Sequence, residues 1–225
     1  MTRALVLADE DDAAGFLGER AADHGVELVV ARRDPAGYPP PLDGFGLVIS
    51  MGSVWSVNAA GSVPWIAREI DLVRNAAASG IPVLGVCFGS QILAAAHGAA
   101  VRTASRPEFG WIRAGTMDED LIPDGPWFAW HHDVVDLPEG AQLLARNTCG
   151  IQAYRAGRCL GIQFHPEVDV TIIERWIRHL GHDLAAAGMD ADDVVAASRD
   201  QVESARHNAH RLFDHFMHLA HAGEV

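Results

Sequence analysis

Lysine is absent from this 225-residue sequence, so all 17 basic residues are arginines. A Schiff-base lysine, a lysine-bound pyridoxal phosphate and the lysine of a phosphate-binding loop are therefore excluded. The formal net charge is −13, and no cluster of cations stands out that could neutralise nucleic-acid phosphates. We expect no nucleic-acid partner.

Cysteine is also scarce, since Cys87, Cys149 and Cys159 are the only three and form no CxxC pair. That pattern fits neither a disulfide framework nor a thiolate zinc site, and it is typical of a reducing compartment. No run of about 18 apolar residues is present that could span a membrane. The apolar segment at the N-terminus is too short for a signal peptide. We therefore predict a cytoplasmic protein without a membrane partner.

The composition, 49% hydrophobic and 21% charged, is that of a globular protein, and 225 residues are enough for one large domain with a full core. Short apolar segments alternate with helical ones along the first hundred residues, and Gly25 and Gly80 mark turns between them. This alternation predicts a doubly wound α/β fold with a parallel sheet covered on both faces. We expect strands at residues 4–7, 26–30, 47–50 and 82–86, and helices at 20–24 and 63–79.

The second half of the chain has a different pattern. Between residues 101 and 164, short strands broken by Gly, Pro, Asn and Asp predict an antiparallel extension and the later strands of the sheet. Beyond Glu167 we expect two helices, at 170–180 and at about 191–221, the second capped by Asp190. We predict a main domain over residues 1–180 and a C-terminal helical appendage over 181–225.

Histidines collect on one face of the last predicted helix. A metal site is conceivable there, but one helix alone seldom closes a coordination shell, so a solvated polar face is favoured and no metal is predicted. The residues that share this face are His207, His210, Asp214, His218 and His221.

Cys87 draws attention because an apolar run, IPVLGV, ends at it and glycines stand two residues before and after it. A sharp strand-to-helix turn would need Gly85 and Gly89, since side chains there would clash. The start of a helix also favours a thiolate and offers N–H groups to an oxyanion. A buried structural cysteine is the alternative, and the glycines alone leave the two about equal.

His165 supplies the candidate base. It follows the predicted strand GIQF and comes just before Pro166 and Glu167. The ends of neighbouring parallel strands lie on one edge of a sheet, so His165 can meet Cys87 there. Glu167 can then hold the imidazole by its other nitrogen. Alone, such a histidine would more often be structural, but together the three residues form a candidate catalytic triad.

At these two segments the sequence resembles the class I (triad-type) glutamine amidotransferases. Residues 85–91, GVCFGSQ, are similar to that family's GxCxGxQ nucleophile motif, with Ser90 at a position where histidine is frequent, and residues 164–167 are similar to its FHPE. The resemblance extends over roughly residues 5–173. It implies a flavodoxin-like fold, mostly parallel with an antiparallel extension, and Cys87, His165 and Glu167 as catalytic residues.

The resemblance also implies the rest of the site. The loop Met51-Gly52-Ser53 stands where the family usually has Gly-Gly-Pro, which makes the N–H groups of Gly52 and Phe88 the expected oxyanion hole. Gln91 would contact the substrate. Trp130-His131-His132-Asp133 is similar to the segment that holds the amino-acid end of glutamine, although a turn with two structural histidines is the alternative. The expected substrate-binding residues are thus Gln91, His131, His132 and Asp133.

The implied reaction is hydrolysis of L-glutamine to glutamate and ammonia through a cysteine thioester, without a cofactor. Ammonia would pass to an acceptor or to a separate synthetase subunit. One alternative is a stand-alone γ-glutamyl hydrolase or peptidase that uses the same triad. A second is a regulatory protein that keeps the fold without the chemistry, which the intact triad argues against. The sequence leaves open the nitrogen acceptor, the partner and the oligomeric state.

Overall fold

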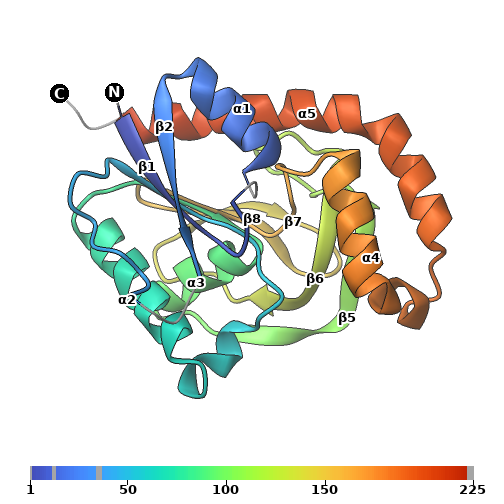
Figure 1. The fold of residues 1–225 in the computed structure, drawn as a ribbon, viewed down its shortest axis with the longest axis horizontal. Helices are drawn as coiled ribbons and strands as arrows, with labels where there is room; N and C mark the ends of the chain where they lie inside the picture. Colours follow the sequence, from blue (N-terminus) through green and yellow to red (C-terminus); the bar gives the residue numbers. More distant parts are fainter. Residues whose placement is uncertain (1, 12–13, 34–36, 222–225) are drawn as a thin grey trace.

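The computed structural model describes residues 2–11, 14–33 and 37–221, and it has a central sheet with helices on both faces (Figure 1). The predicted doubly wound α/β class is confirmed. Along the chain the elements are β1 (Thr2–Ala8), α1 (Gly15–Asp23), β2 (Val26–Arg32), β3 (Leu47–Ser50), the short 3₁₀ helix η1 (Val57–Gly61), α2 (Pro64–Ala78), β4 (Val83–Val86), α3 (Phe88–Ala96), β5 (Val101–Ile112), β6 (Trp127–Val135), β7 (Gln142–Arg146), β8 (Ile151–Ala156), β9 (Cys159–Ile162), α4 (Val170–Ala186) and α5 (Ala191–His221).

The main sheet has seven strands in the order β2-β1-β3-β4-β9-β8-β7. The first five of these are parallel, and β8 and β7 continue the sheet as antiparallel strands. The order of the five parallel strands is that of a flavodoxin-like fold. Because β3, β4 and β9 are neighbours, the loops that follow them meet at one edge of the sheet.

Each face of the sheet has its own hydrophobic core, because successive residues of a buried strand point to opposite sides. Ala4 and Val6 of β1 pack on the side of α1 and α5, whereas Leu5 and Leu7 pack on the side of α2 and α3. All four residues are fully buried. Continuous apolar runs in the sequence therefore correspond to strands covered on both faces.

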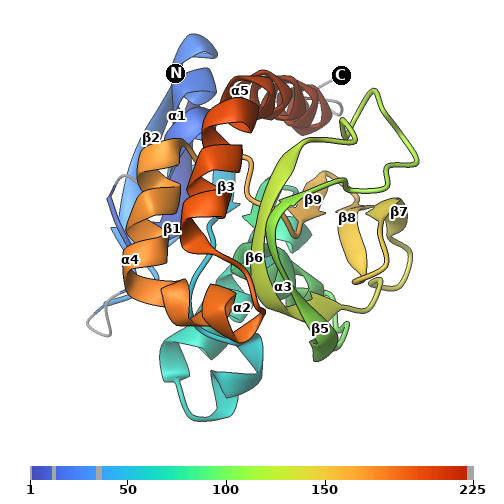
Figure 2. The ribbon, with the colours of Figure 1, turned by 90° about the vertical axis from the view of Figure 1, so that its right-hand side faces the viewer.

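Strands β5 and β6 form a separate antiparallel pair (Figure 2), which packs against α4. Their aromatic residues and the apolar residues of α4 make a third core, which includes Phe109, Phe128, Trp130 and Ile173. β5 begins at Val101, and its pairing with β6 is irregular between Thr103 and Glu108. This pair forms one wall of the candidate site.

Helix α5 lies along α1 in both views (Figures 1 and 2) and covers the same face of the sheet. Leu212, Phe213 and Phe216 of α5 are fully buried and belong to the same core as β1. Burial of each such side chain contributes roughly 2 kcal/mol, so the helix is firmly attached. The predicted boundary between residues 180 and 181 falls inside α4. No helix in the described part of the chain is long and apolar enough to cross a membrane.

Candidate active site

Cys87 stands between the end of β4 and the start of α3, as the sequence predicted. Its φ is 51°, and it is the one non-glycine residue with positive φ among residues 2–11, 14–33 and 37–221. Such backbone strain is typical of functional positions. A Cβ atom on Gly85 would lie 2.5 Å from the carbonyl oxygen of Gly89, and one on Gly89 would collide with the carbonyl of Ser50. Both glycines are therefore required by the turn.

The cysteine side chain lies at the wall of a cavity of about 590 Å³. Cys87 is 6% exposed and its sulfur is 3.8 Å from the carbonyl oxygen of Trp130 in β6. Because Cys87 is the N-cap of α3, the N–H groups of the first helical turn, which have no partner inside the helix, lie close to Cys87. These groups and the positive end of the helix dipole favour negative charge at this point.

His165 reaches the same cavity from the segment after β9. Its main-chain N–H donates to the carbonyl of Phe128, and its Nδ1 lies 2.7 Å from Oε1 of Glu167. His165 and Glu167 are 4% and 2% exposed, and the ring of Trp176 from α4 packs edge-on against the imidazole at 4.6 Å. The Glu167 carbonyl accepts from the N–H of Phe16, so the start of α1 fixes this segment as well.

The charge on His165 is set by its neighbours. Burial lowers the pKa of His165, but attraction to Glu167 and to Cys87 outweighs burial and raises this pKa to about 10. Nε2 of His165 is buried and has no hydrogen-bond partner within the described residues. With Nδ1 bound to Glu167, Nε2 is the nitrogen available for proton transfer. The arrangement can therefore support a nucleophile, a base and a residue that orients the base.

Gly52 lies in the loop after β3, beside both of these side chains. A Cβ atom on Gly52 would be 2.8 Å from Cε1 of His165 and 3.8 Å from Cβ of Cys87. Phe88 is the first residue of α3, and its side chain is 1% exposed. The two residues expected to form the oxyanion hole thus both lie next to Cys87, one in a loop and one at a helix start.

The four expected substrate-binding residues all border the cavity. Gln91 is buried, and its amide donates to the carbonyl of Asp133 at 3.4 Å and to Oε1 of Gln163 at 3.3 Å. The Asp133 carboxylate accepts from the hydroxyl of Ser56 at 2.6 Å. His132 is half-exposed, and its Nε2 lies 3.3 Å from Asp183 of α4. Gln91 and Asp133 are therefore held by protein partners, whereas His132 faces the cavity more openly.

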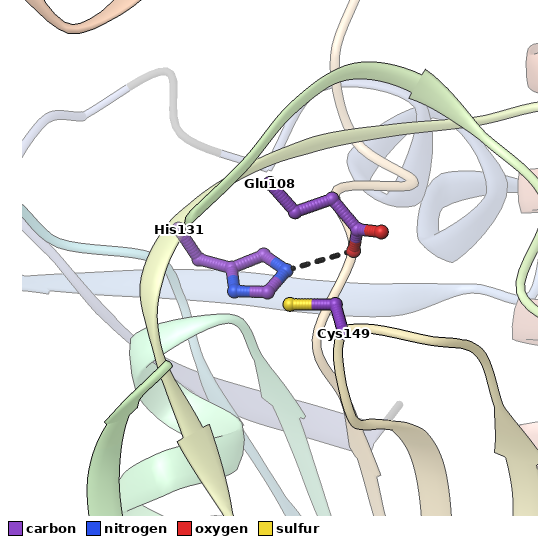
Figure 3. Close-up of side chains that lie close together, drawn as sticks. All are labelled: Glu108, His131 and Cys149. Atoms are coloured by element: carbon purple, nitrogen blue, oxygen red, sulfur yellow. Dashed lines mark hydrogen bonds and ion pairs between the residues drawn. The ribbon is translucent and has the colours of Figure 1, made fainter. Parts of the chain in front are cut away.

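His131 belongs to a second group of chemically active side chains, with Glu108 and Cys149 (Figure 3). One ligand atom from each of these lies within 4.8 Å of the others, as a metal site would require. However, the Glu108 carboxylate accepts hydrogen bonds from Asn147 at 2.7 Å and Gln152 at 2.9 Å, and it lies 3.1 Å from His131 Nε2. We interpret this group as a hydrogen-bond network that joins β5, β6 and the β7–β8 loop.

The histidine-bearing face of α5 is engaged by neighbouring residues. Asp214 binds Arg20 through two hydrogen bonds and lies 2.6 Å from Nε2 of His24, while His210 lies 3.5 Å from Glu19. Binding to Arg20 lowers the pKa of the Asp214 carboxyl. Polar contacts with α1 therefore account for part of this face.

Sequence analysis missed one buried group below the site, formed by Arg33 and Glu69 with Tyr38 and Ser50. One signal was available, because α2 buries Trp65, Ile66, Leu72 and Val73 on one face and Glu69 lies on that same face. A carboxylate on the apolar face of a helix requires a partner. The sequence offers no indication that this partner is Arg33.

Comparisons with known proteins show the family of the chain. A family model described as glutamine amidotransferase class-I matches residues 43–179, more than half of the chain. The chain is 33% identical over 143 residues to a glutamine-hydrolyzing GMP synthase subunit from Saccharolobus solfataricus, covering 58% of this chain and 71% of the relative. It is 36% identical over 149 residues to the glutamine-hydrolyzing GMP synthase of Thiobacillus denitrificans, covering 56% of this chain but only 29% of that longer protein.

Solved structures show the same fold. A glutamine amidotransferase from Thermotoga maritima has a TM-score of 0.84 at 24% identity, over 96% of this chain and 97% of that chain. Another from Methylobacillus flagellatus has a TM-score of 0.87 at 22% identity, over 97% of this chain and 95% of that chain. At these coverages the shared fold extends into the C-terminal helices.

Proposed function

This chain belongs to the class-I glutamine amidotransferase family, and we propose that it hydrolyses L-glutamine to glutamate and ammonia with Cys87, His165 and Glu167 as its triad. The observation that carries the proposal is the convergence of three chain segments at one sheet edge. Cys87 is the N-cap of α3, and Gly52 lies beside Cys87 and His165. Nε2 of His165, the nitrogen that Glu167 does not bind, is buried and has no hydrogen-bond partner within the described residues.

The first half of the reaction forms a thioester. The Cys87 thiolate attacks the side-chain amide carbon of glutamine, and the N–H groups of Gly52 and Phe88 hold the resulting oxyanion. His165, which carries a proton at neutral pH because its pKa is raised to about 10, gives that proton to the departing nitrogen. The carbon–nitrogen bond breaks, ammonia leaves and a γ-glutamyl thioester remains on Cys87.

The second half returns the enzyme to its starting state. A water molecule gives a proton to Nε2 of His165 and attacks the thioester carbon, the carbon–sulfur bond breaks, and glutamate leaves. Glu167 keeps the imidazole oriented through Nδ1, to which it lies at 2.7 Å. Gln91, His131, His132 and Asp133 hold the substrate from the cavity wall.

We further propose that the ammonia passes to a separate synthetase partner. The support comes from the relatives, since the chain covers 71% of a protein named as a GMP synthase subunit but 29% of a longer GMP synthase. Val54 and Trp55, which are 73% and 47% exposed, stand at the cavity wall where a partner could cover them. The cytoplasm stays the predicted location.

A γ-glutamyl hydrolase is the second candidate, and the size of the cavity favours it. A volume of about 590 Å³ is in the range of sites for drug-sized ligands. Beyond the triad this cavity is lined by Trp55, Trp176 and His179, which could contact the amine part of a γ-glutamyl compound.

One experiment separates the two functions. Glutamate release is measured from free glutamine and from γ-glutamyl dipeptides, with the protein alone and with whatever partner co-purifies from its native extract. The amidotransferase proposal expects glutamine to be preferred and its hydrolysis to rise when the partner and its substrates are present. Faster cleavage of dipeptides without any effect of a partner would establish the alternative. No hydrolysis of either substrate, together with no labelling of Cys87 by a glutamine chloroketone, would overturn both.

A further inference from the structure

A buried arginine, Arg33, contacts the loop that contains Gly52. The Arg33 side chain follows β2, is 1% exposed, and donates one hydrogen bond to the carbonyl of Met51 and one to the carbonyl of Gly52, each at 2.9 Å. Its guanidinium carbon is also 4.9 Å from the centre of the Phe88 ring. One side chain therefore contacts both residues of the proposed oxyanion hole.

Glu69 of α2 holds this arginine in place. Nε and Nη2 of Arg33 donate to the two oxygens of the Glu69 carboxylate at 3.0 and 3.1 Å, the paired geometry that arginine favours with carboxylates. Tyr38 and Ser50 donate to the same carboxylate through their hydroxyl groups. The Glu69 side chain is fully buried. Attraction to Glu69 outweighs the effect of burial and raises the pKa of Arg33, so the guanidinium keeps its charge.

The hydrogen bonds of Arg33 determine the direction of the Gly52 N–H. A trans peptide group is planar, and its C=O and N–H point in opposite directions. When the carbonyl of Met51 points to Arg33, the N–H of Gly52 in the same peptide group must point away from it. Gly52 lies beside His165 and Cys87, as its contacts show. Rotation of this one peptide group would remove the N–H from the oxyanion hole.

The loop has little else in its sequence to fix its backbone. Ser53 follows Gly52, so there is no proline ring to restrict φ at that position, and Gly52 itself is conformationally free. A buried ion pair is also a poor source of stability, since apolar residues of the same volume are often as stable. The free-energy cost of burying this pair is explained if the pair specifies one conformation of the loop.

We propose that Arg33 and Glu69 form a clamp that positions the oxyanion hole, with Arg33 and Glu69 as positioning residues rather than catalytic ones. The proposal rests on the function proposed above. It goes further in naming what holds the Met51–Gly52 peptide group in the orientation that the reaction needs.

The test replaces Arg33 with lysine, which keeps the charge but cannot donate to two carbonyls and a carboxylate in one plane. We expect kcat for glutamine to fall at least tenfold, because a misaligned oxyanion donor affects the transition state more than substrate binding. KM should stay within about threefold. The rate of Cys87 alkylation by iodoacetamide, which needs no oxyanion hole, should stay within about twofold.

A matched control is Arg74→Lys. Arg74 also donates to a main-chain carbonyl, that of Ala96, and pairs with the carboxylate of Asp71, but it lies outside the active-site cavity. Its kcat should equal that of the wild type. Equal kcat values for Arg33→Lys and Arg74→Lys would overturn the clamp.

A second readout does not depend on turnover. In the ¹⁵N NMR spectrum, the amide signal of Gly52 should shift or broaden in Arg33→Lys, while that of Gly140 stays unchanged. An unchanged Gly52 signal would overturn the clamp, whether or not the wild type hydrolyses glutamine. Absence of glutamine hydrolysis by the wild type would refute only the proposed function. Should Arg33→Lys fail to fold, Glu69→Gln provides the same test, because it keeps the volume and removes the anchoring charge. Glu69→Gln must then lower kcat and shift or broaden the Gly52 amide signal, as expected for Arg33→Lys.

Discussion

The chain brings a cysteine, a histidine and a glutamate together at two places. The first set is Cys87, His165 and Glu167, and the second set is Cys149, His131 and Glu108. The cysteines differ most in their backbone surroundings, because Cys87 is the N-cap of a helix and has a φ of 51°. Cys149 lies in the loop after β7, where its thiol donates to the carbonyl of Arg106. Burial, reinforced by Glu108, raises the pKa of Cys149 to about 11, so this thiol stays neutral.

The histidines differ in which nitrogens are occupied. His131 has Nδ1 at 3.1 Å from the carbonyl of Asp133 and Nε2 at 3.1 Å from Glu108, so both sides of its ring are engaged. His165 has only Nδ1 engaged, by Glu167, and its Nε2 is left without a protein hydrogen-bond partner in the described part of the chain. Three residue types in proximity therefore do not make a triad. The helix start and the free nitrogen distinguish the first set.

Replacing the cysteines should give the largest difference between the two sets. We expect Cys87→Ala and Cys87→Ser to abolish glutamine hydrolysis and alkylation by a glutamine chloroketone, since no thioester can then form. Cys149→Ala should keep kcat within about twofold of the wild type. Glutamate release and the mass of the labelled peptide report both results.

Two results of these experiments would contradict this comparison. Full hydrolysis in Cys87→Ala would remove Cys87 from the mechanism. A chloroketone adduct on Cys149 in wild-type protein would show that the second set, despite its neutral thiol, is the reactive one.

Replacing the glutamates should also reduce activity more in the first set than in the second, but by less than replacing the cysteines does. Glu167→Gln removes the charge that supports the His165 imidazolium, and we expect kcat to fall roughly ten- to hundredfold, a part of what general acid–base catalysis contributes. Glu108→Gln should leave kcat near the wild-type value and confine any activity change to KM, because Glu108 binds His131 at the cavity wall. It should instead lower stability by about 1 to 3 kcal/mol, as it replaces one of the two acceptor oxygens that His131, Asn147 and Gln152 share.

Steady-state kinetics and thermal melting measured on both glutamate variants provide the check. An equal loss of kcat in the two would mean that both sets serve catalysis. A loss of stability without any loss of kcat in Glu167→Gln would give Glu167 a structural role only.

Much of the fold follows from local sequence. The β1, β3 and β4 runs are continuously apolar because both faces of those strands are covered, and this pattern can be recognised without a structure. Asp190 could be identified as the cap of the last helix, and its carboxylate does accept from the N–H of Asp192. The place where α5 docks could not be deduced, because its apolar face would fit any apolar surface. Only the structure brings Leu212 and Phe213 onto the α1 side of the sheet.

The candidate site was predictable where one segment contains both the reactive residue and the reason for it. Gly85 and Gly89 bracket Cys87, and a side chain at Gly85 would collide with Gly89 of that same turn, although the contact that forbids one at Gly89 comes from Ser50 of β3. The clamp was not predictable, because Arg33, Met51 and Glu69 come from three separate segments that meet only in the fold. The same holds for the second set, which depends on the β7–β8 loop reaching β5 and β6.

The histidine of the first set offers a further test, which is measured in stability rather than in turnover. The pKa of folded His165 is raised from 6.5 to about 10 by Glu167 and Cys87, against the opposing effect of burial. A group with a raised folded pKa adds stability that is fully present below the unfolded pKa and is lost as the pH rises through the folded value. The free energy of unfolding of the wild type, relative to His165→Gln, should therefore be greatest near pH 6 and fall between about pH 6.5 and 10. Urea unfolding of both proteins across this range measures the difference. A difference that grows with pH would mean that folded His165 is neutral at rest, and the proton given to the leaving nitrogen would then need another source.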